Sequence, residues 1–507
     1  MKLPARPVIH WLAALAVAQA VAAEWSDGPG GAFVLFDKDG IRASACGGQA
    51  SLEHGIAFTP DTPSRYASIS KHFLAATLLL EGIDLEAPLH ALIPGLHPAL
   101  GGVTLSRTLD MTGGLPDMME VLWQQGVPFT ATLSAKEIDA TLRRLSATCA
   151  VPGTEMAYSN TGWRLGQTVL QAQRGLYYAV ALRRCLLDPL GLSIAFPYDE
   201  AEPVGGLATG YWRDGKTWRR GRYGLHFSPS GGLAGSAADL ACWAGALMRG
   251  HGPLEGMLER LLAPRHFADG TPSAYRLGLV ETHLGTTRLA GHGGSLPGYR
   301  NHLLMAPEFG VGVILLLNRD EDPLMPALRV MAALVGEAAL LPALDSPSGL
   351  FAAEDGPAWA ELSPGAIEFM GARETLLATG DGRLRSVPSA LEVDLLVTPD
   401  AIAGRIGGVE RRLARVPDGL ALDPGLVGLW REEQFGVDLS INPDGSARWP
   451  WAGGVGRDVT LTPLPGARAL ASLTHAMWGH RPCLWLRPDG ALQLASHRAR
   501  VLRFRKV

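Results

Sequence analysis

Residues 64–82 read S-R-Y-A-S-I-S-K-H-F-L-A-A-T-L-L-L-E-G, and the run over residues 72–80 is almost wholly apolar. This run shows no strand-like alternation and stops at Gly82, so we expect a buried helix. Lys71 stands at the head of that helix. Because burying an unpaired ammonium costs several kcal/mol or drives it neutral, the lysine either reaches the surface or has a chemical role.

Ser68 lies three residues before Lys71, a spacing that places both side chains on one helical face. A serine hydroxyl becomes a good nucleophile when a base removes its proton, and a lysine neutralised by burial can be that base. The helix N-terminus favours the negative charge that develops on the oxygen. Of six lysines, only Lys71 has a serine at this spacing. Ser70, next to Lys71, is expected to point elsewhere.

A second group of polar residues lies in P-G-T-E-M-A-Y-S-N-T-G-W-R, residues 152–164. Tyr158 and Asn160 are two apart and converge on one site if the loop is extended. A tyrosine beside a lysine can pass a proton to a leaving group, and an asparagine can bind a substrate amide. The alternative is an ordinary turn with a packed aromatic ring.

A third group lies in L-A-G-H-G-G-S-L-P-G-Y-R, residues 289–300, where His292 precedes two glycines. Glycine lets backbone approach a substrate and leaves N–H groups free to hold an oxyanion. The alternative is a solvated histidine in a glycine loop.

Composition excludes several other classes of function. The chain of 507 residues is 47% hydrophobic and 19% charged, which is typical of a globular protein larger than one average domain. A net charge of -4 with mixed signs does not indicate a nucleic-acid partner. No cysteine has metal-ligand spacing, and we interpret His475 and His480 as loop residues, so no metal or cofactor is expected.

The first 23 residues have the layout of a secretory signal: a basic start, an apolar stretch over residues 8–17 and small residues at 21–23. The apolar stretch is shorter than the ~18 residues of a membrane span. We therefore expect export to the periplasm or the extracellular space, without a stable membrane span.

Strand and helix signals predict the organisation of the rest. Hairpins are expected over residues 30–45 and 301–319, with a central return strand at 311–317. Between and after them we expect helices, one capped by Ser236 and one over residues 324–341. Strands at both ends with helices between predict an α+β domain, 24–342, built on one antiparallel sheet flanked by helices. Short strand-like runs separated by turn signals then predict two small antiparallel β-barrel-like domains, 343–422 and 423–507.

Taken together, S-I-S-K at 68–71, Y-S-N at 158–160 and H-G-G at 292–294 resemble the three active-site motifs of the serine β-lactamase and penicillin-binding-protein superfamily, in its class C-like branch. H-G-G in place of K-T-G resembles esterases and D-aminopeptidases of that branch. The stretches L-D-M-T-G-G-L-P-D (109–117) and G-G-L-A-G-S-A-A-D-L (231–240) also resemble its members.

The resemblance implies a catalytic role for each motif. Ser68 attacks a carbonyl and Lys71 acts as its base. Tyr158 passes a proton to the leaving amine, and Asn160 helps to orient the lysine and the substrate. His292 assists leaving-group protonation or binding.

The same resemblance implies an oxyanion hole formed by the backbone N–H groups of Ser68 and Ser295. Gly293 and Gly294 would line the substrate-binding edge beside it.

The two terminal β domains resemble those of bacterial D-aminopeptidases, which implies that residues 472–483 enter the site. That segment contains no carboxylate for a substrate amine, and Asp117 is an alternative partner. We expect a D-stereospecific aminopeptidase that releases N-terminal D-amino acids from short peptides or amides. The alternatives are an esterase, a D,D-carboxypeptidase, a β-lactamase or a non-catalytic muropeptide-binding protein. β-Lactams are candidate inhibitors, and a homodimer is a candidate assembly.

Overall fold

The computed structural model describes residues 8–387, 391–432, 434–451 and 456–507, and the chain divides into two compact units. The first unit comprises residues 1–85, 163–265 and 274–340, and the second comprises residues 86–162, 266–273 and 341–507. The second unit therefore combines helices from the predicted catalytic range with both predicted β domains.

An antiparallel sheet with strand order β11-β12-β13-β14-β1-β2 forms the centre of the first unit. Because β1 pairs with both β2 and β14, strands from the two ends of the predicted domain meet in the middle of the sheet. Both predicted hairpins and the predicted α+β class are confirmed. The strand bounds are β1 (Gly31–Asp37), β2 (Gly40–Gly47), β11 (Val280–Leu284), β12 (Thr287–Leu296), β13 (Tyr299–Ala306) and β14 (Val311–Leu317).

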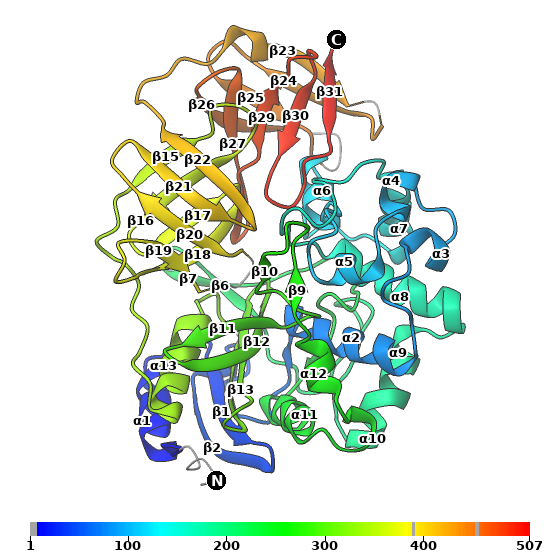
Figure 1. Ribbon diagram of the computed structural model, residues 1–507, viewed down its shortest axis with the longest axis vertical. Coiled ribbons are helices and arrows are strands. Elements are labelled where there is room, and N and C mark those ends of the chain that lie inside the picture. Colours follow the sequence, from blue (N-terminus) through cyan, green and yellow to red (C-terminus); the bar gives the residue numbers. More distant parts are fainter. Residues whose placement is uncertain (1–7, 388–390, 433, 452–455) are drawn as a thin grey trace. The chain divides into compact units, whose positions relative to one another are not determined.

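Helices cover both faces of this sheet (Figure 1). The residues of β14 are all buried, which requires cover on both sides. Helices α1 and α13 contact each other and the sheet, and α11 packs against β1, β2 and β14 on the other face. The helix bounds are α1 (Trp11–Ala23), α2 (Lys71–Leu80), α11 (Ala237–Arg249) and α13 (Leu324–Val335).

The ends of these helices follow local capping chemistry. The side chains of Ser236 and Asp239 form a reciprocal capping box at the start of α11, as the sequence predicts. Helix α13 is shorter than predicted. It ends at Val335, because Gly336 with its φ of +75° closes the helix in the left-handed region before it can reach residue 341.

Helix α1 lies inside the predicted signal segment and packs on the sheet. Ala14 and Ala18 are fully buried, and a Cβ on Gly47 of β2 would lie 2.1 Å from the carbonyl oxygen of Ala22. Cleavage after residue 23 remains a prediction, and it would remove this packing. Among the described residues, no helix combines the length and the apolar character needed to cross a membrane.

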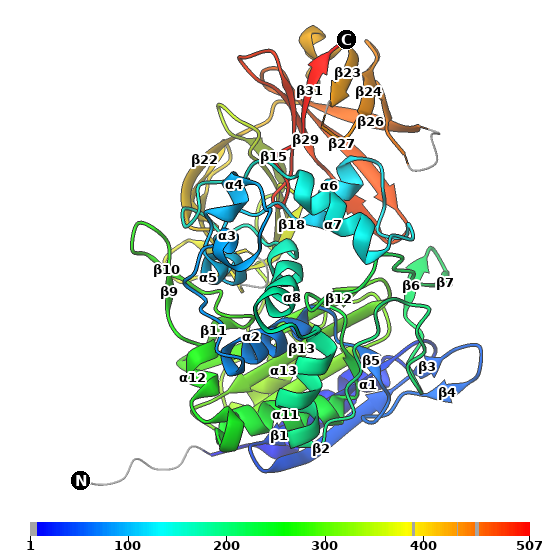
Figure 2. The same ribbon diagram turned by 90° about the vertical axis from the view of Figure 1, so that its right-hand side faces the viewer.

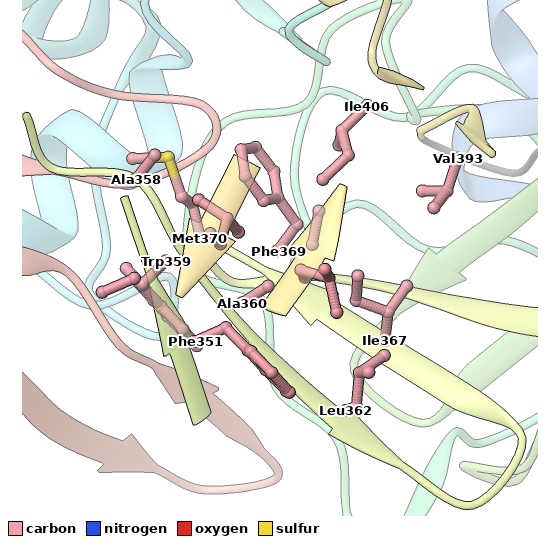
Figure 3. Close-up of a cluster of buried hydrophobic side chains, with 14 of the residues drawn as sticks. Phe351, Ala358, Trp359, Ala360, Leu362, Ile367, Phe369, Met370, Val393 and Ile406 are labelled. Atoms are coloured by element: carbon pink, nitrogen blue, oxygen red, sulfur yellow. The ribbon is translucent and has the colours of Figure 1, made fainter. Parts of the chain in front are cut away.

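The second unit contains short helices and two closed antiparallel barrels. Each barrel ring has eight strands among the described residues, and the pairing of β26 with β27 closes the second ring. The first barrel consists of β15 (Gly349–Ala352), β16 (Trp359–Ser363), β17 (Ala366–Phe369), β18 (Ala372–Ala378), β19 (Leu384–Ser386), β20 (Val393–Val397), β21 (Ala401–Ile406) and β22 (Val409–Arg415). Its interior is filled by large apolar side chains, including Phe351, Trp359 and Phe369 (Figure 3).

The second barrel is filled in the same way around Trp430 and Trp449. Its strands are β23 (Gly428–Glu432), β24 (Val437–Ile441), β25 (Ser446–Trp449), β26 (Arg457–Leu464), β27 (Arg468–His475), β29 (Cys483–Leu486), β30 (Leu492–Ala495) and β31 (Arg503–Lys506), with β28 (Trp478–His480) attached to β27.

The same unit contains short helices, one of which, α6, lies beside the second barrel in both Figures 1 and 2. Gln124 Nε2 of α6 donates to the Ala499 carbonyl oxygen at 3.2 Å. These helices are α3 (Leu89–Leu92), α4 (Pro98–Gly101), α5 (Leu105–Leu109), α6 (Met118–Gln124) and α7 (Ala135–Arg144).

Candidate active site

The predicted Ser68–Lys71 pair lies where a 3-10 turn, η1 (Ala67–Ser70), runs into α2. Lys71 is fully buried, and its Nζ donates to Ser68 Oγ at 2.9 Å and to the Ser230 carbonyl oxygen at 2.6 Å. The indole ring of Trp163 lies 6.0 Å from the same Nζ. The lysine therefore does not reach the surface, and its polar partners include the candidate nucleophile and a backbone carbonyl.

The two neighbouring serines differ in their surroundings. Ser68 is partly accessible, whereas Ser70 is fully buried and its Oγ accepts the Leu233 N–H at 3.1 Å. Ala67, just before the candidate nucleophile, has a φ of +51°, which is uncommon for a residue with a side chain. The backbone thus presents Ser68 from a constrained turn and turns Ser70 into the interior.

The H-G-G motif lies on β12, at a part of the strand with one unpaired edge. Strand β11 pairs with β12 only as far as Gly291, so within the described chain residues 292–296 pair only with β13. A Cβ on Gly294 would lie 2.2 Å from the Tyr66 carbonyl oxygen. Glycine at this position therefore lets β12 contact the turn that precedes Ser68, which leaves an unpaired strand edge beside the hydroxyl.

His292 is buried on this strand, and both of its ring nitrogens have partners. Its Nδ1 lies 2.6 Å from the Gly293 carbonyl oxygen, and its Nε2 lies 2.9 Å from Tyr275 Oη. Burial, and then the positive charge of Lys71, hold the pKa of His292 well below its ordinary value. The imidazole is therefore neutral near pH 7.

Tyr158 and Asn160 belong to the second unit, where an irregular loop carries both. The backbone and side-chain nitrogens of Asn160 donate to the Asp117 carboxylate at 2.7 and 2.9 Å. The same carboxylate caps α6 by accepting the N–H groups of Met119 and Glu120. Fully buried with four donors around it, Asp117 organises the loop and is not available as the partner for a substrate amine.

A segment of the second barrel, residues 496–500 between β30 and β31, contacts the Tyr158 loop. The Arg498 guanidinium carbon lies 4.6 Å from the centre of the Tyr158 ring, and the Tyr158 N–H donates to His497 Nε2 at 3.4 Å. Residues 472–483, in contrast, contain the β27–β28 hairpin. There the ring centres of Trp478 and Phe129 lie 4.3 Å apart.

Both barrels also bind this loop through one carboxylate. Glu155, three residues before Tyr158, is 6% exposed and forms ion pairs with Arg411 of β22 and with Arg500 of the second barrel. The neighbouring Met156 N–H donates to the Gly407 carbonyl oxygen at 2.8 Å. The loop is thus held by contacts from two barrels that follow it in the chain.

The sequence indicated the three motifs but missed the residues that support them. Tyr275, Ser230 and Arg498 lie far from their partners in the chain, and each belongs to an ordinary-looking local sequence. No local pattern identified them; the signal would have been their recurrence in an alignment of relatives.

Comparisons with known proteins show the family to which the chain belongs. A family model described as Beta-lactamase matches residues 17–337. The chain is 27% identical over 314 residues to a D-aminopeptidase of Gluconobacter oxydans, and 29% identical over 316 residues to a D-aminopeptidase of Brucella canis. These stretches cover 61% of this chain in both cases, and 59% and 60% of the two relatives. The chain thus spans about three fifths of the length of the curated relatives it matches.

Solved structures share the fold. An octameric penicillin-binding protein homologue from Pyrococcus abyssi aligns with a TM-score of 0.57 and 18% identity, over 95% of this chain and 96% of that one. The D-amino acid amidase from Ochrobactrum anthropi SV3 aligns with a TM-score of 0.54 and 22% identity, over 64% of this chain and 98% of that one. At these identities the likeness concerns the fold.

Proposed function

The chain belongs to the beta-lactamase family, and from that premise we propose that it is a serine hydrolase that forms an acyl-enzyme on Ser68. The single observation that carries the proposal is the 2.9 Å contact between Ser68 Oγ and the Nζ of the fully buried Lys71. A buried amine loses part of the stabilisation of its charged form, which suits it to accept the hydroxyl proton.

The proposed reaction proceeds in two steps. Ser68 Oγ attacks the substrate carbonyl while its proton passes to Lys71, and the carbonyl oxygen takes the negative charge. The bond to the leaving nitrogen then breaks, Tyr158 supplies the proton that the leaving amine needs, and the proton held by Lys71 replaces it on Tyr158. Water repeats the sequence on the acyl-enzyme, so that Ser68 is regenerated and the acid is released.

The unpaired edge of β12 is the proposed substrate-binding edge. Backbone N–H groups that face no strand can receive the charge that develops on the carbonyl oxygen, and this stabilisation is usually a large part of acyl-transfer catalysis. In this proposal the N–H groups of Ser68 and Ser295 form the oxyanion hole. Gly293 and Gly294 allow the substrate backbone to approach.

For the substrate class we propose amides and short peptides that begin with a D-amino acid. This choice rests on the two relatives named D-aminopeptidase and on the two β-barrels that follow the family domain. The partner of the substrate's free amine is not Asp117, because that carboxylate already accepts four hydrogen bonds.

A substrate panel tests this proposal. We expect the purified chain to hydrolyse D-alanine p-nitroanilide faster than the L-enantiomer, with Ser68→Ala as the background control. Ester hydrolysis without D-amide turnover would instead indicate an esterase, and rapid turnover of nitrocefin a β-lactamase. Tight binding of muropeptides without turnover of any substrate would indicate a non-catalytic binding protein.

A further inference from the structure

Tyr275 is a buried residue of the first unit that none of the three motifs includes. It is 1% exposed and lies in the turn that leads into β11. The turn is closed by a bridge between Tyr275 and Val280, and Val280 pairs with Gly291 of β12. This register brings the tyrosine hydroxyl to His292, the residue that follows Gly291.

The same turn packs on the start of α2. Gly278 has a φ of +74°, and a Cβ there would lie 2.7 Å from the His72 nitrogen and 2.9 Å from the Lys71 carbonyl carbon. A side chain at this position would push the turn away from the helix. Tyr275 is therefore held in a segment that contacts both β12 and the first residue of the lysine-bearing helix.

The hydrogen bonds of His292 define a single tautomer. The Gly293 carbonyl oxygen can only accept, so Nδ1 carries the hydrogen in the 2.6 Å contact between them. A neutral imidazole has one N–H, which leaves a lone pair on Nε2. The Tyr275 hydroxyl lies 2.9 Å from Nε2 and therefore donates to it. The planes of the two rings are perpendicular.

We propose that Tyr275 is a positioning residue that locks His292 in the Nδ1–H tautomer and so fixes the Gly293–Gly294 peptide at the unpaired edge of β12. The Gly293 carbonyl oxygen and the Gly294 N–H belong to one peptide plane, so holding the carbonyl also orients the N–H. His292 then acts through the backbone. Its Nε2 has no proton to give to a leaving group.

The consequence for catalysis rests on the proposed hydrolase function. If Tyr275 is replaced by Phe, the hydrogen bond that its hydroxyl donates to Nε2 is lost, and the Nδ1–H tautomer loses that stabilisation relative to the Nε2–H tautomer. One lost hydrogen bond at the substrate-binding edge predicts about a tenfold decrease in kcat/KM on a substrate that the wild type turns over.

Tyr299→Phe is the matched control. Tyr299 is also buried, as the first residue of β13, and its hydroxyl donates to the Ala208 carbonyl oxygen at 2.7 Å instead of to His292. We expect this control to lose a comparable amount of thermal stability while kcat/KM stays within twofold of the wild type. An equal decrease in kcat/KM for both variants would overturn the proposal, since a general loss of packing would then explain it.

A spectroscopic readout separates positioning from packing. In nitrogen-15 histidine spectra, the His292 signals are identified by their loss in His292→Gln, and their shifts report which nitrogen carries the proton. We expect the Nδ1–H form in the wild type and a gain of the Nε2–H form in Tyr275→Phe. An Nε2–H form in the wild type overturns the proposal, and so does an unchanged tautomer in Tyr275→Phe.

If Tyr275→Phe does not fold, the tautomer in the wild-type spectrum alone still tests the proposal. The hydrolase function and the positioning role of Tyr275 can also be refuted independently of each other. A wild type that shows the Nδ1–H tautomer but neither hydrolyses the substrate panel nor reacts with a serine-directed probe contradicts the hydrolase function and leaves the Tyr275–His292 interaction in place.

Discussion

The Ser68–Lys71 group and the Tyr158–Asn160 group are held in place by different forces. In the first unit, backbone geometry dominates: a 3-10 turn enters a buried helix, and Gly294 allows a strand to contact that turn. In the second unit, an irregular loop is held by side-chain charges, and Glu155 is separated from its partner Arg411 by 256 residues.

This difference determines what each group tolerates. A position fixed by backbone contact is sensitive to added volume, because interiors are closely packed. A position fixed by a buried ion pair is sensitive to loss of one charge, because the remaining charge is left without a partner. The two groups should therefore respond in opposite ways to volume-changing and charge-changing substitutions.

The largest expected effect is that of Lys71→Met, which removes the proposed base. We expect kcat to fall about a thousandfold, because general bases contribute about 10² to 10⁴ to the rate. Thermal stability should be kept, since a buried amine is replaced by an apolar chain of similar length. The exposed Lys216→Met serves as the control, and kcat of Lys71→Met within tenfold of wild type would contradict the role of the lysine.

Glu155→Gln tests the charge-held loop. The substitution keeps the shape but leaves the mostly buried side chains of Arg411 and Arg500 without their anion, so we expect a loss of about 3 kcal/mol in the free energy of unfolding. Urea unfolding measures it. The control is Glu361→Gln, whose pair with Arg481 is more exposed and should be worth less than about 1 kcal/mol. Equal losses for both would show that burial of the ion pair is unimportant.

Gly294→Ala tests the backbone-held group by adding volume. A Cβ 2.2 Å from the Tyr66 carbonyl oxygen forces β12 away from the turn, so we expect a loss of about 1–3 kcal/mol in stability together with a lower rate of Ser68 labelling. Gly205 has open space around its Cβ position, and Gly205→Ala should change stability by less than about 0.5 kcal/mol. A stable, fully reactive Gly294→Ala would refute the close-approach argument.

Buried histidines occur in both units and predict a shared acid sensitivity. Burial lowers the pKa of His72 to about 3, of His302 to about 4 and of His480 to about 3. Below pH 6.5 the unfolded chain binds protons that the folded chain does not, so the free energy of unfolding falls as pH falls. Each histidine contributes about 1 kcal/mol between pH 7.5 and 5.5.

One buried carboxyl opposes this trend. Burial raises the pKa of Glu120 to about 7, so between pH 4.5 and 7 the folded state binds its proton more tightly and stability is lost as pH rises. The combined effect of the three histidines on the free energy of unfolding exceeds the opposing effect of Glu120. Urea midpoints at pH 7.5, 6.5 and 5.5 should therefore decrease, and His302→Gln should reduce the slope. Constant midpoints would contradict the predicted neutral histidines.

The sequence predicted the first group well because its determinants are local. Periodicity gave the buried helix after Ser68, and the three-residue spacing to Lys71 placed the two side chains together. Turn signals gave both hairpins of the sheet and the two terminal barrels. The apolar pattern predicts that α13 continues to residue 341, whereas Gly336 ends the helix in the left-handed region.

The contacts that hold the Tyr158–Asn160 group in place could not be predicted from local sequence. Asp117 was considered as a partner for a substrate amine, whereas the structure uses it as a helix cap and as the acceptor for Asn160. The contact of Arg498 with Tyr158 depends on how the second barrel folds against the loop, which no spacing rule expresses. Long-range contacts of this kind become visible only in the folded chain.

Covalent labelling with a fluorophosphonate, followed by intact mass and peptide mapping, tests the central claim most directly. We expect one adduct, on Ser68, in the wild type and in the control Ser70→Ala, whose hydroxyl is buried on the Leu233 N–H. Ser68→Ala should carry no adduct while keeping the wild-type unfolding midpoint. Full labelling of Ser68→Ala would contradict the account, because the nucleophile would then lie elsewhere in the chain.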